Sequence, residues 1–177
     1  MHREQKEWCE EIKSKFPEYF DGSFVLDVGS LDVNGTNRYL FSGGLYIGID
    51  VLPGPGVDIV SIGHLFVAPS NCLFDVVLST NAFEHDVFWY KTIPHVFNCL
   101  RHGGLMFFSC GYSHRVHGTS DVSPHDSATS RVNGPWASHY KNLTPQEILP
   151  LLNWSKCFSA YMMGTSGRDL RFWGIKR

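Results

Sequence analysis

Two acidic segments near the N-terminus lie where hydrophobic runs end. The run FVLDV contains Asp27 and leads into a loop with Gly29 and Gly35, and the later run LYIGID ends in Asp50. A glycine loop after a strand lets backbone N–H groups approach a polar ligand closely. An acid about 20 residues further on can accept both hydroxyl groups of a ribose. Together they predict a nucleoside site, whereas each alone also fits an ordinary turn.

A third polar turn follows the hydrophobic run at residues 74–79. It reads Asn81-Ala82-Phe83-Glu84-His85 and is expected at the same edge of the sheet. His85 titrates near neutrality and is a candidate base, although it is equally suited to holding the turn by hydrogen bonds.

The stretch 111–143 is rich in Ser, His, Gly and Asp and has little periodicity. Long loops inside compact domains are often functional, so this segment is expected on the substrate side of a crevice. Its histidines are further candidate bases, with solvent-exposed histidines as the simpler alternative: His114, His117, His125 and His139. The aromatic residues Tyr112, Trp136 and Tyr140 either form an acceptor pocket or hold the loop in place.

Asp121 and Asp126 accompany these histidines and raise the question of a metal site. No H-x-x-x-H pair on a helix and no cysteine-based ligand spacing occurs, so we expect no metal.

The elements that must position these residues follow from the apolar runs. Strands are expected at 24–28, 45–50, 57–61, 74–79, 104–110, 157–163 and 170–176. The first five are apolar on both faces, which is typical of a parallel sheet covered by helices. Helices are expected at 3–16, 35–42, 92–101 and 144–152. The N-terminal helix, within residues 1–20, either covers the site, contributes to a dimer or only packs on the sheet.

The chain has 177 residues and a net charge of −2, which fits one domain over 1–177 and argues against binding of duplex nucleic acid. The five cysteines include no C-x-x-C pair, so reduced thiols in a reducing compartment are expected. Without a secretory signal or a run of about 20 apolar residues, we expect no membrane association and a cytoplasmic location.

The order of these parts over residues 22–110 resembles the small, single-domain class I S-adenosylmethionine-dependent methyltransferases. The resemblance implies a Rossmann-like α/β fold: an open, mostly parallel seven-stranded sheet flanked by helices, with an antiparallel C-terminal strand. It implies S-adenosyl-L-methionine as cofactor and S-adenosyl-L-homocysteine as product. The residues that would hold the cofactor are Asp27, Gly29, Ser30, Leu31, Asn34, Gly35, Asp50, Val51, Ile62, Gly63, Asn81, Ala82, Phe83 and Glu84.

The sequence departs from the family pattern in three places. Leu31 stands where a glycine is usual, as in a G-S-L-x-x-N-G variant of the loop. Only residues 51–56 separate the second and third strands, so the crossover helix is missing or the third strand is vestigial. The acid usual after the third strand is absent, and Ser61, Ile62 and Gly63 stand there.

The predicted function is methyl transfer to an oxygen or nitrogen of a small-molecule or sugar acceptor, by a monomer or homodimer. His85 and His114 are the candidate catalytic residues. A catalytically idle methyltransferase-like binding module or partner subunit is the main alternative. A nicotinamide-dependent oxidoreductase ranks third, because the compact G-x-G-x-x-G loop is absent.

Overall fold

A computed structural model of the chain describes residues 3–69 and 73–177. Its centre is a seven-stranded sheet with the order β3-β2-β1-β4-β5-β7-β6. The first five strands run parallel. The C-terminal hairpin forms one edge, where β7 runs antiparallel to its neighbours β5 and β6. The strands are β1 (Phe24–Val28), β2 (Leu45–Asp50), β3 (Ile59–Val60), β4 (Phe74–Thr80), β5 (Leu100–Gly111), β6 (Phe158–Ser166) and β7 (Asp169–Lys176).

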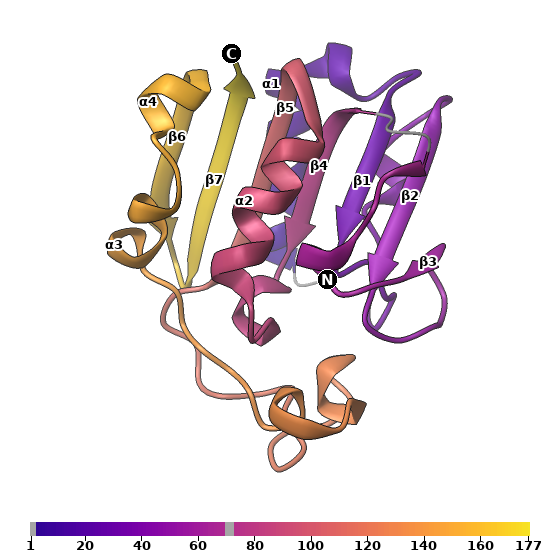
Figure 1. The fold of residues 1–177 in the computed structure, drawn as a ribbon, viewed down its shortest axis with the longest axis vertical. Helices are drawn as coiled ribbons and strands as arrows, with labels where there is room; N and C mark the ends of the chain where they lie inside the picture. The colour runs from indigo at the N-terminus through magenta and orange to yellow at the C-terminus, as the bar shows by residue number, and fades with distance from the viewer. Residues whose placement is uncertain (1–2, 70–72) are drawn as a thin grey trace.

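Helices cover both faces of the sheet (Figure 1). α1 (Arg3–Lys15) lies on one face, where Trp8, Cys9 and Ile12 are buried against the central strands. The opposite face carries the longer helix α2 (Trp89–Cys99) and the short helices α3 (Pro145–Ile148) and α4 (Trp154–Cys157).

The alternation of β4 explains why the sheet needs both layers. Val77 packs in the core on the α2 side, whereas its neighbours Val76 and Leu78 pack on the α1 side. Successive strand side chains point to opposite faces, so a strand that is apolar throughout must be covered twice. The predicted Rossmann-like fold with a mostly parallel, seven-stranded sheet is therefore confirmed.

Several element boundaries differ from the sequence prediction. The segment 35–42 forms only a 3₁₀ turn, Arg38–Leu40, in place of a helix. β5 begins at Leu100, because α2 ends at Cys99 and the chain enters the sheet before the Gly103-Gly104 pair. The segment 144–152 is divided into α3 and a 3₁₀ turn, and a capping box formed by Thr144 and Glu147 begins it.

The short connection between β2 and β3 contains no helix. β3 has only two residues, and Ile59 pairs with Ile49 of β2. The Arg38 guanidinium donates hydrogen bonds to the carbonyl oxygen of Gly56 and to the carboxylate of Asp58, which holds the connection against β2. A vestigial third strand and a missing crossover helix thus occur together.

The four cysteines within the described residues are free, and Cys72 lies outside those residues. No helix in the described part of the chain is long and apolar enough to cross a bilayer.

Candidate active site

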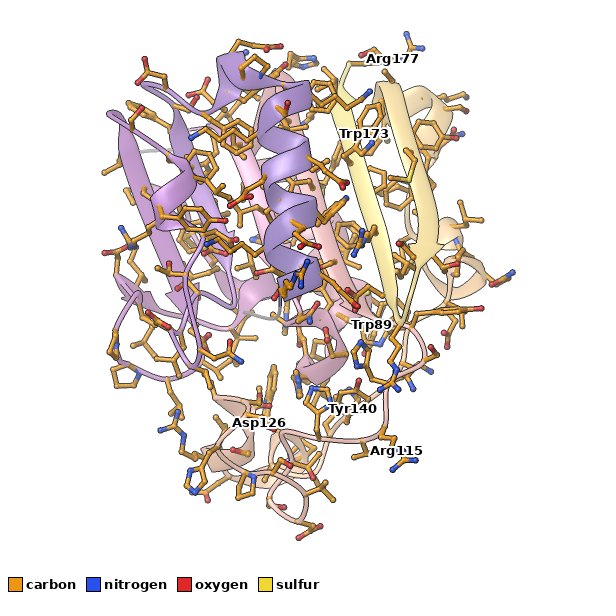
Figure 2. All side chains as sticks on the ribbon, turned by 180° about the vertical axis from the view of Figure 1, so that it is seen from behind. Trp89, Arg115, Asp126, Tyr140, Trp173 and Arg177 are labelled. Carbon is orange, nitrogen blue, oxygen red and sulfur yellow. The ribbon has the colours of Figure 1, made fainter. Side chains whose placement is uncertain are left out.

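A cavity of about 400 Å³ lies at the carboxyl ends of β1, β2 and β4. The segment 111–143 extends beyond this edge of the sheet (Figure 1) and contributes part of the lining. Figure 2 shows Asp126 and Tyr140 on this segment, beyond the strand ends. Polar groups converge here because all parallel strands end at the same edge.

The loop after β1 is fixed to its neighbours by backbone contacts. The N–H groups of Gly29 and Ser30 both donate to the carbonyl oxygen of Ile49, at 2.9 and 3.1 Å. Gly29 has a φ of +81°, and a Cβ built there would lie 2.2 Å from the Cβ of Ala82. Only glycine lets this loop lie so close to the turn after β4.

Asp50 organises the same loop from the end of β2. Its carboxylate accepts hydrogen bonds from the backbone N–H groups of Leu31 (3.0 Å) and Val51 (2.7 Å). Burial raises the pKa of Asp50, while these bonds act in the opposite direction. A carboxylate has about four acceptor positions, so two such bonds leave capacity for ligand hydroxyl groups.

Asp27 is a second buried acid on the cavity wall, with 2% of its surface exposed. The Tyr46 hydroxyl donates to its Oδ2 at 2.7 Å, but Oδ1 has no partner among the described residues. Burial raises the pKa of Asp27 to about 7. Nearby, the Asn37 amide donates to Thr80 Oγ1 at 2.9 Å, and Asn37 Oδ1 is also buried without a partner.

His85 lines the cavity from the turn after β4 and is 5% exposed. Its ring lies at centroid distances of 5.5 Å from His117 and 5.2 Å from Tyr140. Burial lowers the pKa of His85 to about 3, so the imidazole is neutral at physiological pH. Its buried Nδ1 has no partner among the described residues.

His114 is held more firmly than any other histidine of the loop. Its Nε2–H donates to Oδ1 of the buried Asp169 at 2.9 Å. Asn142 fixes its backbone twice: Asn142 Oδ1 accepts from the His114 N–H (3.1 Å), and Asn142 Nδ2 donates to the His114 carbonyl oxygen (2.9 Å). An imidazole whose Nε2 donates presents Nδ1 as a proton acceptor.

Most of the sequence-predicted site residues line the cavity: Asp27, Gly29, Ser30, Leu31, Asn34, Gly35, Asp50, Val51, Gly63, Asn81, Ala82, Phe83, His85 and His114. Ile62 and Glu84 do not, although Ser61 and Gly63 do. The Glu84 side chain is 1% exposed, and burial raises its pKa to about 8.

The candidate residues of the segment 111–143 also divide into those that line the cavity and those that do not. Trp136, His117 and Asp126 line the cavity, whereas Tyr112, Tyr140, His125, His139 and Asp121 do not. Within residues 3–69 and 73–177, no three His, Cys, Asp or Glu side chains gather in a group that could hold a metal ion.

Sequence reasoning missed several lining or supporting residues. Gln5 lies on the apolar face of α1, one turn before Trp8 and Cys9, and lines the cavity. A polar residue on an otherwise apolar helix face is the pattern in the sequence that could have indicated this position. Asn37 and Asp169 have no local signal, because their contacts depend on partners distant in the sequence.

The strand order and the cavity at the carboxyl edge define the fold of the class I S-adenosylmethionine-dependent methyltransferases. No protein-family model matches the chain, and no curated protein sequence matches it. The chain is similar to solved structures over nearly its whole length. The sequence identities are low, so this similarity establishes only the fold.

Three solved methyltransferases illustrate this similarity. The 1,6-didemethyltoxoflavin-N1-methyltransferase of Burkholderia thailandensis, with bound substrate and S-adenosylhomocysteine, has a TM-score of 0.63 at 13% identity, covering 97% of this chain and 77% of that one. The magnesium protoporphyrin IX methyltransferase of Synechocystis, with bound cofactor, has a TM-score of 0.60 at 11% identity, covering 98% and 80%. A 16S rRNA guanosine methyltransferase of T. thermophilus has a TM-score of 0.57 at 14% identity, covering 100% and 44%.

Proposed function

We propose that this protein binds S-adenosyl-L-methionine in the cavity and transfers its methyl group to a small-molecule or sugar acceptor. The observation that carries the proposal is the convergence of three segments on one cavity within a methyltransferase fold. These segments are the Gly29 loop, Asp50 and the turn Asn81–Phe83.

The residues present fit the adenosyl group. The two backbone bonds hold the Asp50 carboxylate at the end of β2 and leave acceptor positions for the two ribose hydroxyls. The Gly29 loop supplies a wall without side-chain bulk. Ser61, Gly63 and Phe83 lie on the same cavity and would flank the adenine in place of the usual acid after β3.

When bound, the cofactor supplies an electrophilic methyl group on a positively charged sulfur. The protein then has to hold the acceptor in line with that methyl group and to remove the proton from an acceptor O–H or N–H. His114 is the better base, because Asp169 fixes its ring with Nδ1 left as the acceptor. His85 is a weaker base, since burial lowers its pKa to about 3, and it would orient the acceptor through a hydrogen bond.

The proposed acceptor class rests on the charge of this chain and not on the similar structures. The three solved structures are methyltransferases of 1,6-didemethyltoxoflavin, magnesium protoporphyrin IX and a 16S rRNA guanosine, so the fold does not select one acceptor. A net charge of −2 argues against an extended phosphate-binding surface and favours a small acceptor. A monomer or homodimer in the cytoplasm completes the proposal.

Calorimetric titration with S-adenosylhomocysteine tests the cofactor. We expect micromolar binding to the wild type, no binding of NAD and at least tenfold weaker binding to Asp50→Ala, because hydrogen bonds to a charged group contribute about 1.5–3 kcal/mol. Asp121→Ala, a change at an exposed loop position, is the matched control. Absence of adenosyl binding to the wild type would overturn the proposal and favour the partner-subunit alternative.

A further inference from the structure

Three of the eight arginines have no acid partner within the described part of the chain. Four others form ion pairs with carboxylates: Arg3, Arg38, Arg101 and Arg171. Arg177 donates to two backbone carbonyl oxygens. The remaining three make neither an ion pair nor a side-chain hydrogen bond with any described residue: Arg115, Arg131 and Arg168. A guanidinium group that pairs with no carboxylate of its own chain keeps its charge and its donors for an anionic ligand.

These three arginines surround the cavity from two different sides. Arg131 lies close enough to Asp50 for its charge to oppose the rise in the pKa of that acid. Arg115 and Arg168 line the cavity, and their side chains are exposed. Arg115 belongs to the segment after β5 and Arg168 to the turn between β6 and β7, whereas Asp27 and Asp50 belong to β1 and β2. The strand order therefore separates two arginines on one side of the cavity from two acids on the other.

Backbone hydrogen bonds hold Arg168 beside the segment that carries Arg115. The carbonyl oxygen of Arg168 accepts from the N–H groups of Tyr112, at 2.8 Å, and Ser113, at 3.0 Å. Arg115 follows Ser113 by two residues, and Figure 2 shows it beyond the strand ends. The two guanidinium side chains thus start from neighbouring parts of the backbone at one edge of the cavity.

Two acids lie near Arg168, and neither neutralises it. Asp169 is buried, and its carboxylate accepts the hydrogen bond from His114. Glu4 Oε2 lies 3.7 Å from a Cβ built at Gly167, but no ion pair joins it to Arg168 within the described chain. Two uncompensated positive charges at one edge of a cavity attract an anion.

We infer that Arg115 and Arg168 bind an oxyanion of the acceptor, so that the acceptor is an acidic small molecule. It is a carboxylate or a phosphate ester that also carries the O–H or N–H group to be methylated. The inference rests on the proposed function and names the substrate class of that site. Planar guanidinium groups suit this role, because their donors match two oxygens of a carboxylate or phosphate.

The proposed base lies next to this subsite. His114 directly precedes Arg115, and its ring is fixed by Asp169, the residue after Arg168. An acceptor held by its oxyanion would therefore have its O–H or N–H group near His114 Nδ1. The proton moves to Nδ1 as the bond between methyl and sulfur breaks and the bond between methyl and acceptor forms.

The experiment measures by calorimetry the binding of charged and neutral probes to the protein saturated with S-adenosylhomocysteine. One pair of probes is 4-hydroxybenzoate and 4-hydroxybenzyl alcohol, and the other is glucose 6-phosphate and glucose. We expect the wild type to bind a charged probe about tenfold more tightly than its neutral partner. The pair that shows the larger difference identifies the oxyanion as a carboxylate or as a phosphate.

Variants locate the effect within the molecule. Arg115→Gln and Arg168→Gln should each weaken the charged probe by about 5- to 10-fold and leave the neutral probe unchanged. Arg168→Lys keeps the charge without the planar fork, so an intermediate loss is expected. Arg177→Gln is the matched control, because it removes the same charge at the opposite end of the sheet (Figure 2). All of these variants should bind S-adenosylhomocysteine as the wild type does.

The outcomes separate this inference from the proposed function. Three results would overturn the oxyanion subsite while the cofactor proposal stands: no preference for either charged probe, unchanged binding in Arg115→Gln and Arg168→Gln, or an equal loss in Arg177→Gln. A wild-type protein that does not bind S-adenosylhomocysteine would overturn both.

Discussion

The two sides of the cavity are built differently. On the β1–β2 side, short loops follow directly from strand ends, and backbone groups and the buried acids Asp27 and Asp50 form the wall. On the opposite side, the segment 111–143 contributes imidazole and indole rings. A few long-range contacts hold it, among them the hydrogen bonds of His114 to Asp169 and Asn142.

This difference suggests a division of labour. Groups fixed by the sheet itself suit a ligand that every turnover uses, such as a cofactor. Groups on a long loop can differ in type and position without disturbing the sheet, which suits recognition of one particular acceptor. The two sides should therefore respond differently to mutation: one through cofactor affinity and the other through turnover.

The largest effect is expected on turnover, from His114→Ala. Removing a general base slows proton transfer by about 10²–10⁴-fold. Asp169→Asn should also lower the rate, because it leaves the imidazole present but removes the carboxylate that fixes its tautomer and orientation. The measurement is S-adenosylhomocysteine release with a panel of small hydroxyl and amine acceptors, with His125→Ala as the exposed control.

Both variants should bind S-adenosylhomocysteine as the wild type does. Undiminished turnover in His114→Ala would remove this histidine from the mechanism, and a parallel loss of cofactor affinity would contradict the division between the two sides.

Gly29→Ala should cause the next largest effect, this time on the cofactor side. The added Cβ combines a positive φ, which costs about 1–2 kcal/mol, with a clash against Ala82, which adds about 1–3 kcal/mol. Gly134→Ala is the matched control, because Gly134 has a φ of +84° and nothing within 4 Å of the added Cβ.

Urea unfolding and titration with S-adenosylhomocysteine measure the two effects. Gly29→Ala should lose both stability and affinity for S-adenosylhomocysteine. Gly134→Ala should lose only the stability that the positive φ costs, because its added Cβ meets no other atom. Equal losses in the two variants would show that backbone strain, and not the contact with Ala82, determines the result.

The same contrast between the two sides explains what the sequence could predict. The β1–β2 side follows from local patterns: an apolar run, a glycine loop and an acid at the next strand end. Most of its predicted residues accordingly line the cavity.

The other side could be predicted only as a loop with histidines in it. The importance of His114 over His125 depends on Asp169, 55 positions away, and no local pattern encodes that pairing. Gln5 was missed for a similar reason, since the face of α1 is visible in the sequence but its position against β1 is not. The lost crossover helix was visible as a short connection, whereas the compensating bonds of Arg38 were not.

Asn142→Ala should have an intermediate effect confined to the loop side. The change removes two hydrogen bonds to the His114 backbone, which should lower the free energy of unfolding by about 1–3 kcal/mol and leave the affinity for S-adenosylhomocysteine unchanged. Asn133→Ala, at an exposed position without a side-chain cap bond, is the control. Weakened cofactor binding in Asn142→Ala would show that the loop also supports the other wall.

The smallest effect is expected for Glu84→Gln, and it concerns how the free energy of unfolding changes with pH. Burial raises the pKa of Glu84 to about 8, so the folded protein retains a proton that the unfolded chain releases near pH 4.3. Between these two values the wild type loses stability as the pH rises.

The window from pH 6.5 to 8 isolates this contribution. The lowered pKa of His85, about 3, acts in the opposite direction but only below about pH 6.5, and Asp27, with a pKa of about 7, contributes equally to both proteins. Across this window the wild type should lose about 1–2 kcal/mol more than Glu84→Gln, measured by urea unfolding at each pH. Equal slopes would mean that Glu84 is already ionised in the folded protein, and the loop side would then contain a buried charge that needs a partner.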